Sequence, residues 1–285
     1  MSGVGSTEPP DGVGATEPSG SEGGGLAGAG SGKGVFDELR RVVEAGGRAV
    51  VFTIISSGEH VGAKLLVRED GSTAGDGPEE LAALAPEAIR SGRSHVLEHD
   101  DLTVFADVFA PPPRLLVYGA VDTAEALCRA AKLLGWTTIV ADARARFATR
   151  ERVPSADELL VAWPEEALAQ VAPDVGTAVV VLTHDDKFDL PALQAALQSD
   201  AFFIGALGSR RNQERRRERL LEAGVGETEF ERISGPCGLD IGAESPAETA
   251  LSILAEILAV RVGRPGGALK GARTRIHAEA VAGKK

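Results

Sequence analysis

The chain is poor in cysteine and in long apolar stretches, and each shortage excludes a class of protein. Its two cysteines, Cys128 and Cys237, are too few for a disulfide framework or a tetrahedral zinc set. No apolar stretch approaches the roughly 20 residues that span a bilayer. The first residues also lack the basic and apolar regions of a secretory signal. We therefore expect a cytoplasmic protein without a membrane span.

Basic charge is also in short supply. Acidic residues outnumber basic ones, 42 to 30, and the formal net charge is -12. General nucleic-acid binding needs a basic field that attracts phosphates, so this charge argues against it. What the chain does have is a hydrophobic content of 43% over 285 residues, which suffices for a sizeable core in one or two domains.

The first 34 residues have a composition of their own. Residues 1–34 are rich in Gly, Ser, Thr, Pro and Glu and contain almost no large apolar residue. Burial cannot offset the entropy of ordering such a segment, so we expect a disordered tail. The Gly-Ser-Gly-Lys-Gly run that ends at Gly34 lacks the spacing and the preceding strand of a phosphate-binding P-loop, which favours a linker.

Residues 35–110 predict a small α+β domain. Apolar residues at helical spacing indicate a helix over 35–45, and a second helix is expected over 79–91. Stretches rich in apolar and β-branched residues predict strands at 49–55, 62–68, 94–98 and 102–109. The run Pro111-Pro112-Pro113 cannot continue a strand and predicts a stiff hinge after this domain.

Residues 114–265 change to alternating strands and helices. Mostly apolar strands are predicted at 114–118, 137–141, 158–161, 178–182 and 201–204. Strands without polar alternation, separated by helices, indicate a parallel sheet that is covered on both faces. We therefore predict an α/β fold, a Rossmann-like, doubly wound domain.

The last helix of this domain has a clear start. Ser245-Pro246-Ala247-Glu248 is a capping box with proline at the first helical position. Behind it, an apolar stripe is expected to face the core, formed by Leu251, Leu254, Ile257 and Leu258. A loose tail is expected over 266–285.

The turn Gly119-Ala120-Val121-Asp122 occupies the position of a dinucleotide fingerprint but keeps only its first glycine. Val121 stands where a second glycine would admit a pyrophosphate, and Asp122 brings negative charge to the helix start. Asp122-Thr123-Ala124-Glu125 instead resembles a capping box. Asp142 ends the next strand, where an acid would hold a ribose hydroxyl, with Arg144 and Arg146 close behind. The alternative for Asp142 is a turn residue.

Polar side chains follow the strand predicted at 178–182. Thr183, His184, Asp185 and Lys187 are candidate cofactor-binding residues, because loops at the carboxyl ends of parallel strands carry sites. The alternative is a polar turn that caps the next helix.

A second candidate group lies between Gly205 and Arg211. Gly205, Gly208 and Ser209 offer backbone N–H groups and a hydroxyl, while Arg210 and Arg211 carry the planar guanidinium that suits phosphate oxygens. The alternative is a helix start with two solvated arginines. The run from Glu214 to Arg219 mixes both signs of charge and predicts a solvated helix face.

A third candidate group precedes the capping box. Gly238 and Gly242 frame Asp240, and the two glycines indicate close backbone approach or positive φ. Asp240 is a candidate ligand acceptor or a brace within the loop. Cys237 beside it is either a small core residue or a thiol that carries sulfur or binds a metal.

With these residues in view, the chain resembles the XdhC/CoxI family, the xanthine dehydrogenase accessory factors. The resemblance runs from about Val35 to Gly263. It is carried by THDDKFDLPAL (Thr183 to Leu193), FIGALGSRR (Phe203 to Arg211) and GPCGLDIGAESPAETALSILAEI (Gly235 to Ile257). It implies binding of the molybdenum cofactor, as molybdopterin or its nucleotide form, and delivery of its sulfurated form to a molybdenum hydroxylase. It also implies a homodimer, a sulfur-donating partner, and a maturation factor rather than an enzyme.

The chain departs from the family pattern in two places. Relatives often carry a GSAPRPPG-like loop and a Gly-Gly-Cys-Val-Glu motif, where this chain has residues 57–63 and 75–78 without a cysteine. The family's Gly-Ala-Gly-His turn has become the sequence from Gly119 to Asp122.

Three hypotheses follow. The first is a maturation factor for a hydroxylase of the xanthine or carbon monoxide dehydrogenase type. Its cofactor would lie between the small domain and the strand ends of the Rossmann half, with phosphate on Arg210 and Arg211 and the pterin facing His184 and Asp240. The second is an NAD(P)-dependent oxidoreductase, and the third is a regulatory or scaffold protein that has lost its ligand.

Overall fold

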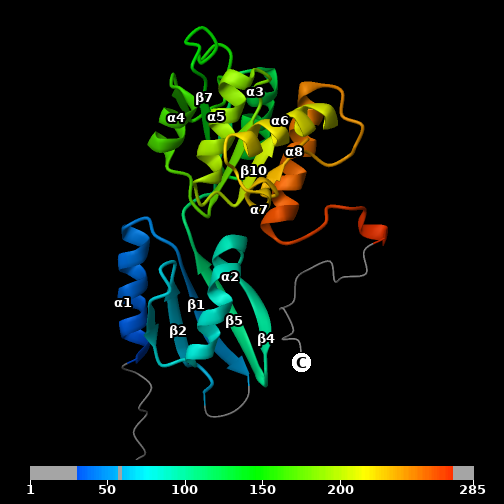
Figure 1. Ribbon diagram of the computed structural model, residues 1–285. Helices are drawn as coiled ribbons and strands as arrows, with labels where there is room; N and C mark the ends of the chain where they lie inside the picture. Colours follow the sequence, from blue (N-terminus) through cyan, green and yellow to red (C-terminus); the bar gives the residue numbers. More distant parts are fainter. Residues whose placement is uncertain (1–30, 57–59, 272–285) are drawn as a thin grey trace, which may run out of the picture.

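The computed structural model describes residues 31–56 and 60–271. In this structure the chain forms two parts, each built on its own sheet and joined through Pro111-Pro112-Pro113 (Figure 1). The predicted disorder of residues 1–30, the motif residues 57–59 and the tail residues 272–285 lie outside the described residues.

The amino-terminal part packs helices on both faces of an antiparallel sheet of order β3-β2-β1-β5-β4. Val35 and Leu39 of the first helix pack on one face, and the second helix covers the other face around Phe52. The elements are α1 (Ser31–Glu44), β1 (Ala49–Ser56), β2 (Lys64–Arg68), β3 (Thr73–Gly75), the 3-10 helix η1 (Glu79–Leu84), α2 (Ala85–Ser91), β4 (His95–His99) and β5 (Leu102–Phe109).

Local pattern predicted most of these elements. Helix α1 begins at Ser31, ahead of the expected start at Val35, so the expectation of a disordered linker is wrong for residues 31–34. A helix nucleated by packed apolar residues extends into neighbours that carry no periodic signal. The strand β3 was not predicted, because Thr-Ala-Gly is too short to show an alternating pattern.

The carboxyl-terminal part carries a parallel sheet of six strands in the order β11-β10-β9-β6-β7-β8. Counted in chain order, this is the 3-2-1-4-5-6 arrangement of dinucleotide-binding folds, so the predicted Rossmann-like domain is confirmed. The elements are β6 (Arg114–Tyr118), α3 (Asp122–Lys132), β7 (Thr137–Ala141), β8 (Glu158–Leu160), α4 (Pro164–Val171), β9 (Thr177–Val181), α5 (Asp186–Leu197), β10 (Phe203–Ala206), α6 (Arg210–Glu222), α7 (Glu227–Phe230), β11 (Ile233–Ser234), α8 (Pro246–Arg261) and the 3-10 helix η2 (Leu269–Gly271).

Helices cover both faces of this sheet. Leu127 of α3 and Ile253 of α8 belong to the core on one face, while Leu168 of α4 and Leu193 of α5 belong to the core on the other. Figure 1 shows these helices surrounding the strands. The layered packing leaves the carboxyl ends of β6 and β9 at the point where the strand order reverses.

Two expectations for helix ends and faces need correction. The N-cap of α3 is Val121, without a side-chain cap, and Glu125 accepts a bond from Ser155 Oγ at 2.7 Å, so the capping box at Asp122 is wrong. The capping box of α8 is confirmed, with Glu248 N donating to Ser245 Oγ at 3.3 Å. Leu251, however, is 57% exposed and Ile253 is buried. Leu254 and Ile257 are buried and Leu258 packs against the same core, so the expected stripe is confirmed at these positions and wrong at Leu251.

The two parts meet at the amino-terminal edge of the parallel sheet. Arg48 Nη1 pairs with Asp174 Oδ2 at 2.9 Å, just before β9 begins, and Val175 packs against the core of the amino-terminal part. Near the end of α8, Arg261 Nε donates to Arg90 O at 3.4 Å. The carboxyl ends of the strands lie at the opposite edge, contrary to the expectation that a ligand sits between them and the amino-terminal part.

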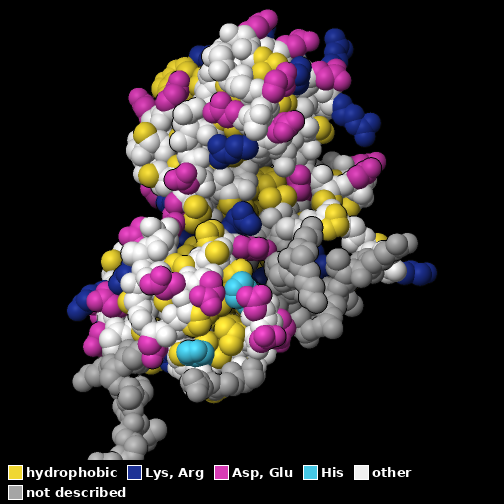
Figure 2. All heavy atoms as spheres, turned by 60° about the horizontal axis from the view of Figure 1, so that its bottom comes forward, with side chains coloured by type: hydrophobic (Ala, Val, Ile, Leu, Met, Phe, Trp, Pro, Cys, Tyr) yellow, Lys and Arg dark blue, Asp and Glu magenta, His cyan; other side chains and the backbone are white. Residues whose placement is uncertain are grey.

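On the face shown in Figure 2, acidic side chains are distributed over both parts of the molecule. Within the described residues, no helix combines the length and apolarity needed to cross a bilayer.

Candidate functional site

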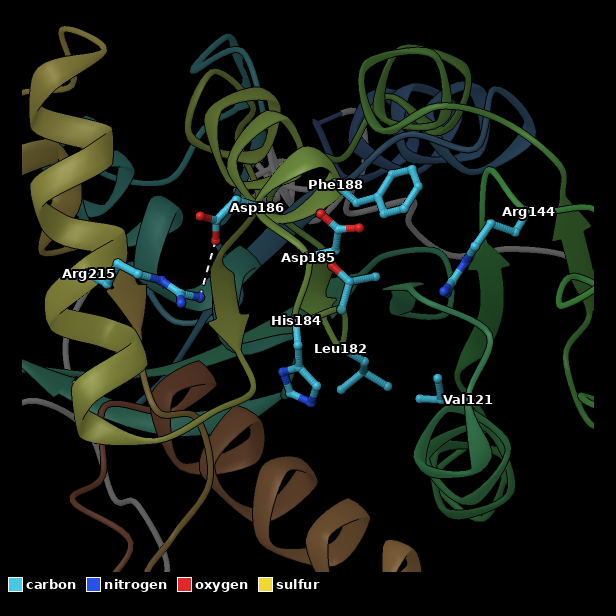
Figure 3. Close-up of a pocket in the computed structure, with 9 residues that line it drawn as sticks. Val121, Arg144, Leu182, His184, Asp185, Asp186, Phe188 and Arg215 are labelled. Atoms are coloured by element: carbon cyan, nitrogen blue, oxygen red, sulfur yellow. Dashed lines mark ion pairs between the residues drawn. The ribbon is translucent and has the colours of Figure 1, made fainter.

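A cavity of about 600 Å³ opens at the carboxyl ends of β6 and β9, where the strand order reverses (Figure 3). Doubly wound folds bind ligands in this crevice. The cavity is lined by Val121, Arg144, Leu182, Thr183, His184, Asp185, Asp186, Phe188 and Arg215. All of these residues come from the carboxyl-terminal part, so one sheet edge and its loops build the wall.

Three of the candidates predicted after β9 line this cavity. Asp185 is the N-cap of α5, where its carboxylate accepts from Lys187 N at 3.1 Å, so the alternative of a helix cap is confirmed for this residue. His184 is exposed on the loop before it. Thr183 is buried, and its Oγ1 donates to Asp189 Oδ1 at 2.5 Å. The loop thus presents an imidazole and a carboxylate around an anchored threonine.

A buried ion pair lies beneath Thr183. Asp189 Oδ2 accepts from Arg216 Nε at 2.9 Å and from Arg216 Nη2 at 2.6 Å, and both side chains are almost fully buried. Arg216 Nη2 also donates to Leu207 O at 2.7 Å, which ties the loop after β10 to the loop after β9. The solvated face predicted from Glu214 to Arg219 is therefore wrong at Arg216, because α5 brings a buried carboxylate to it.

Arg215 is a cavity residue that sequence reasoning missed. Its Nη2 lies 3.2 Å from Asp186 Oδ1, and Figure 3 shows this pair closing one side of the cavity. Arg219, one turn further along α6, lies 3.6 Å from the same carboxylate. A mixed charge run gives no sign of which arginine faces a neighbouring helix, so only the tertiary packing identifies Arg215.

Asp142 lies at the expected strand end, but its carboxylate turns inward. Oδ2 accepts from Ala120 N at 3.0 Å, and the side chain forms a two-pronged bond with Arg144. Burial alone would raise the pKa of Asp142, but the bonds from Arg144 and Ala120 outweigh it and hold the pKa below its ordinary value. The same hydrogen bond raises the pKa of Arg144. The pair is therefore ionised, and Arg144 is the member that reaches the cavity.

Close backbone approach explains the first fingerprint glycine. Gly119 has φ +114°, and a Cβ there would lie 3.1 Å from Thr183 Cγ2. A side chain at this position would push the turn after β6 away from the loop after β9. Val121 follows it and lines the cavity, as its position in the fingerprint suggests.

The second candidate group lies beside the cavity rather than in it. Gly205 is inside β10, opposite Val180, and is not part of a loop. Ser209 is the N-cap of α6, with its Oγ accepting from Asn212 N at 3.2 Å. Arg210 and Arg211 are exposed, and their side chains have no hydrogen-bond or ion-pair partner within the described residues.

The remaining candidates are also outside the cavity lining. Lys187 Nζ lies 5.0 Å from the centre of the Trp163 ring. Gly238 N donates to Glu256 Oε2 at 2.5 Å, while Asp240 and Gly242 are exposed. Gly208, with φ +151°, lies in the loop that precedes α6. None of these residues belongs to the cavity lining, and Lys187 lies in the first turn of α5.

Neither thiol is exposed for chemistry. Burial raises the pKa of both Cys128 and Cys237 to about 12, so both are protonated near neutral pH. In the parts of the chain that the structure describes, no three His, Cys, Asp or Glu side chains form a metal-binding group. This geometry supports ligand binding through hydrogen bonds and arginine charge.

Comparison with known proteins identifies a family for the part of the chain that forms the cavity. The family model of the XdhC Rossmann domain matches residues 115–257. A Bacillus subtilis (strain 168) protein, named as one subunit of a probable xanthine dehydrogenase, is 35% identical over 167 residues, which is 58% of this chain and 48% of the relative. "Molybdenum cofactor insertion chaperone PaoD" of Escherichia coli (strain K12) is 33% identical over 162 residues, which is 57% of this chain and 44% of the relative.

A solved structure agrees with the fold. The crystal structure of a xanthine dehydrogenase from Bacillus halodurans matches with a TM-score of 0.57 and 25% sequence identity, over 79% of this chain and 66% of that one. The chain spans less than half of the two named relatives, at 48% and 44% of their lengths.

Proposed function

Because the chain belongs to the XdhC family, we propose that it is an accessory factor that binds the molybdenum cofactor and assists its maturation and insertion into a molybdenum hydroxylase. The client would be of the xanthine or carbon monoxide dehydrogenase type. The observation that carries the proposal is the cavity at the strand-order reversal, because all its lining residues fall inside the segment that the family model matches.

The lining suits an anionic ligand with a polar ring. His184, Thr183 and Asp185 supply hydrogen-bonding groups at the loop after β9, and Arg144 and Arg215 approach from different sides (Figure 3). The pterin ring of molybdopterin has several hydrogen-bond donors and acceptors, and the molybdopterin side chain ends in a phosphate, for which guanidinium is the best-matched side chain. In this proposal the cofactor is bound cargo, and the protein is a maturation factor without a catalytic residue of its own.

Residues beside the cavity extend the proposed site. Arg211 precedes Arg215 by four residues, so both lie on one face of α6. Contacts from Gly208, Ser209 and Arg210 to the cofactor remain predictions, as do those from Lys187, Gly205, Gly238, Asp240 and Gly242. A sulfur-donating partner and a homodimer are likewise proposed. Since both thiols are buried and protonated, we assign sulfur transfer to the partner.

An NAD(P)-dependent oxidoreductase is the second candidate, and the sheet order favours it. Against it stand Val121 at the second fingerprint position and the inward carboxylate of Asp142. We expect no tight binding of NAD or NADP, and micromolar binding of either would promote this candidate. A scaffold protein without a ligand is the third.

Ligand analysis of the full chain, purified under native conditions from cells that make the cofactor, separates the three candidates. Oxidised pterin fluorescence in the extract supports the accessory factor, nicotinamide supports the oxidoreductase, and neither supports the scaffold.

Calorimetric titration with molybdopterin then tests the cavity. His184→Ala and Arg215→Ala are each expected to lower affinity about tenfold, because each removes a hydrogen bond to the ligand that is charge-assisted or buried. Arg217→Ala is the matched control, since Arg217 is exposed on the same helix and pairs with Glu227. Equal loss in all three variants would contradict the placement of the site.

A further inference from the structure

We infer that Arg144 holds the phosphate end of the ligand at the β7 side of the cavity, and that Asp142 is closed to ribose hydroxyls. The identity of the ligand rests on the proposed function, but the position of its phosphate rests on the geometry alone. The inference assigns the anion-binding role to a residue other than Arg210 and Arg211.

The carboxylate of Asp142 has no acceptor capacity left. Oδ1 accepts from Arg144 N and Arg144 Nε, both at 2.9 Å. Oδ2 accepts from Arg144 Nη2 at 2.8 Å and from Ala120 N at 3.0 Å. A carboxylate offers about four lone-pair positions, and four protein donors fill them. In a dinucleotide fold, the acid at this strand end accepts from the ribose 2′-hydroxyl, and here it cannot.

The same bonds fix the direction of the Arg144 guanidinium. Its Cζ lies 4.1 Å from the centre of the Phe147 ring and 5.6 Å from that of Phe188. Nε and Nη2 face Asp142, which leaves Nη1 without a protein partner among the described residues. Arg144 lines the cavity and is about one-third exposed, so its unused N–H edge is available to a ligand. A guanidinium held in place this way loses little side-chain entropy on binding an oxyanion.

The other arginines near the cavity are less well placed. The carboxylate of Asp186 forms ion pairs with Arg215 at 3.2 Å and with Arg219 at 3.6 Å. Arg210 and Arg211 are exposed and do not line the cavity. Arg144 therefore combines cavity position, fixed orientation and a donor edge that a ligand can reach.

The group recognised is a phosphomonoester dianion, which can come from the pterin side chain or from the 2′-phosphate of a dinucleotide. An arginine just after this strand end is the usual way in which the fold accepts a 2′-phosphate. Because the two sources present the same phosphate group, the experiment measures binding of a probe from each source.

The test measures binding to the full chain by calorimetry. The probes are inorganic pyrophosphate, molybdopterin with and without its phosphate, NAD and NADP. The variants are Arg144→Ala, Arg144→Lys, the pair Arg210→Ala with Arg211→Ala, and the control Arg146→Ala. Arg146 is exposed two residues away, so it matches the change in charge outside the cavity. If Arg144→Ala does not fold, the double variant Asp142→Asn with Arg144→Gln replaces it. This variant removes both charges, so no unpaired carboxylate is left buried.

We expect Arg144→Ala and the double variant to lower pyrophosphate affinity about tenfold or more, and Arg146→Ala to change it less than about twofold. Arg144→Lys should recover part of the affinity. If molybdopterin binds more tightly with its phosphate than without it, and Arg144→Ala abolishes the difference, the pterin side chain is the source of the phosphate. If the protein prefers NADP to NAD and Arg144→Ala abolishes that preference, the source is the 2′-phosphate of a dinucleotide.

Loss in the Arg210 and Arg211 variant with none at Arg144, or equal loss at Arg146, would overturn the inference. Failure of the wild-type protein to bind molybdopterin, with Arg144-dependent pyrophosphate binding intact, would sink the proposed function and leave the inference standing. Molybdopterin binding that does not depend on Arg144 would support the proposed function and overturn the inference about Arg144.

Discussion

At the residue scale, the pair between Arg216 and Asp189 fixes the floor of the cavity. Both side chains are almost fully buried, and Asp189 also holds Thr183. Removing one partner of a buried ion pair leaves an uncompensated charge, so Arg216→Ala should lower the free energy of unfolding by about 3–5 kcal/mol. Urea denaturation followed by circular dichroism measures the change.

The neighbouring residue provides the control for this prediction. Arg217 is about half exposed, and its pair with Glu227 is a surface pair. Arg217→Ala should therefore cost less than about 1 kcal/mol. The double change Arg216→Met with Asp189→Leu should recover much of the stability, since apolar residues of similar volume often replace a buried pair. A mild effect of Arg216→Ala would show that the pair is solvated.

The thiols give a second prediction at this scale. Burial raises the pKa of Cys128 and Cys237 to about 12, against an ordinary value of 9.0. Near neutral pH neither forms the reactive thiolate, so the native protein should react with a thiol reagent far more slowly than the denatured protein. Above the ordinary pKa only the unfolded thiols lose protons, so stability should fall as pH rises from about 9 to 12. Fast labelling of one thiol in the native protein would contradict this assignment.

At the scale of elements, sequence pattern located most strands and helices, because each carries a local signal of its own. Alternation of apolar strands with helices predicted the parallel sheet, and Ser245 with Glu248 predicted the start of α8. The cavity was predictable only in part. Thr183, His184 and Asp185 directly follow a buried strand, whereas Arg215 and the burial of Arg216 depend on how α5 packs against α6. No local pattern encodes that contact.

Two substitutions in helix α8 test which of its sides faces the core. Ile253 is fully buried and Leu251 is 57% exposed, although both are apolar. Ile253→Ala should cost about 2–5 kcal/mol because it leaves a cavity. Leu251→Ala should change stability by no more than about 0.5 kcal/mol, as is usual for surface positions. Thermal unfolding of the two variants compares them directly, and the reverse order of effects would mean that α8 is rotated.

At the scale of the whole molecule, two arginines connect the parts at the edge opposite the cavity. Arg48 reaches Asp174 in the carboxyl-terminal part, and Arg261 reaches Arg90 O at the end of α2. The Arg261 guanidinium also lies 5.5 Å from the centre of the Trp136 ring. No cavity-lining residue belongs to the amino-terminal part. Weakening the contact between the two parts should therefore leave ligand binding in the cavity unchanged.

The double variant Arg48→Ala with Arg261→Ala examines this separation in the full chain. Loss of both contacts should loosen the contact between the two parts and increase the radius of gyration measured by small-angle X-ray scattering. Pyrophosphate affinity should change less than about twofold, because every cavity contact remains in place. Arg40→Ala with Arg217→Ala removes one exposed arginine from each part and controls for net charge. A large loss of affinity in the variant with Arg48→Ala and Arg261→Ala, but not in the control, would show that the amino-terminal part affects the cavity through the sheet.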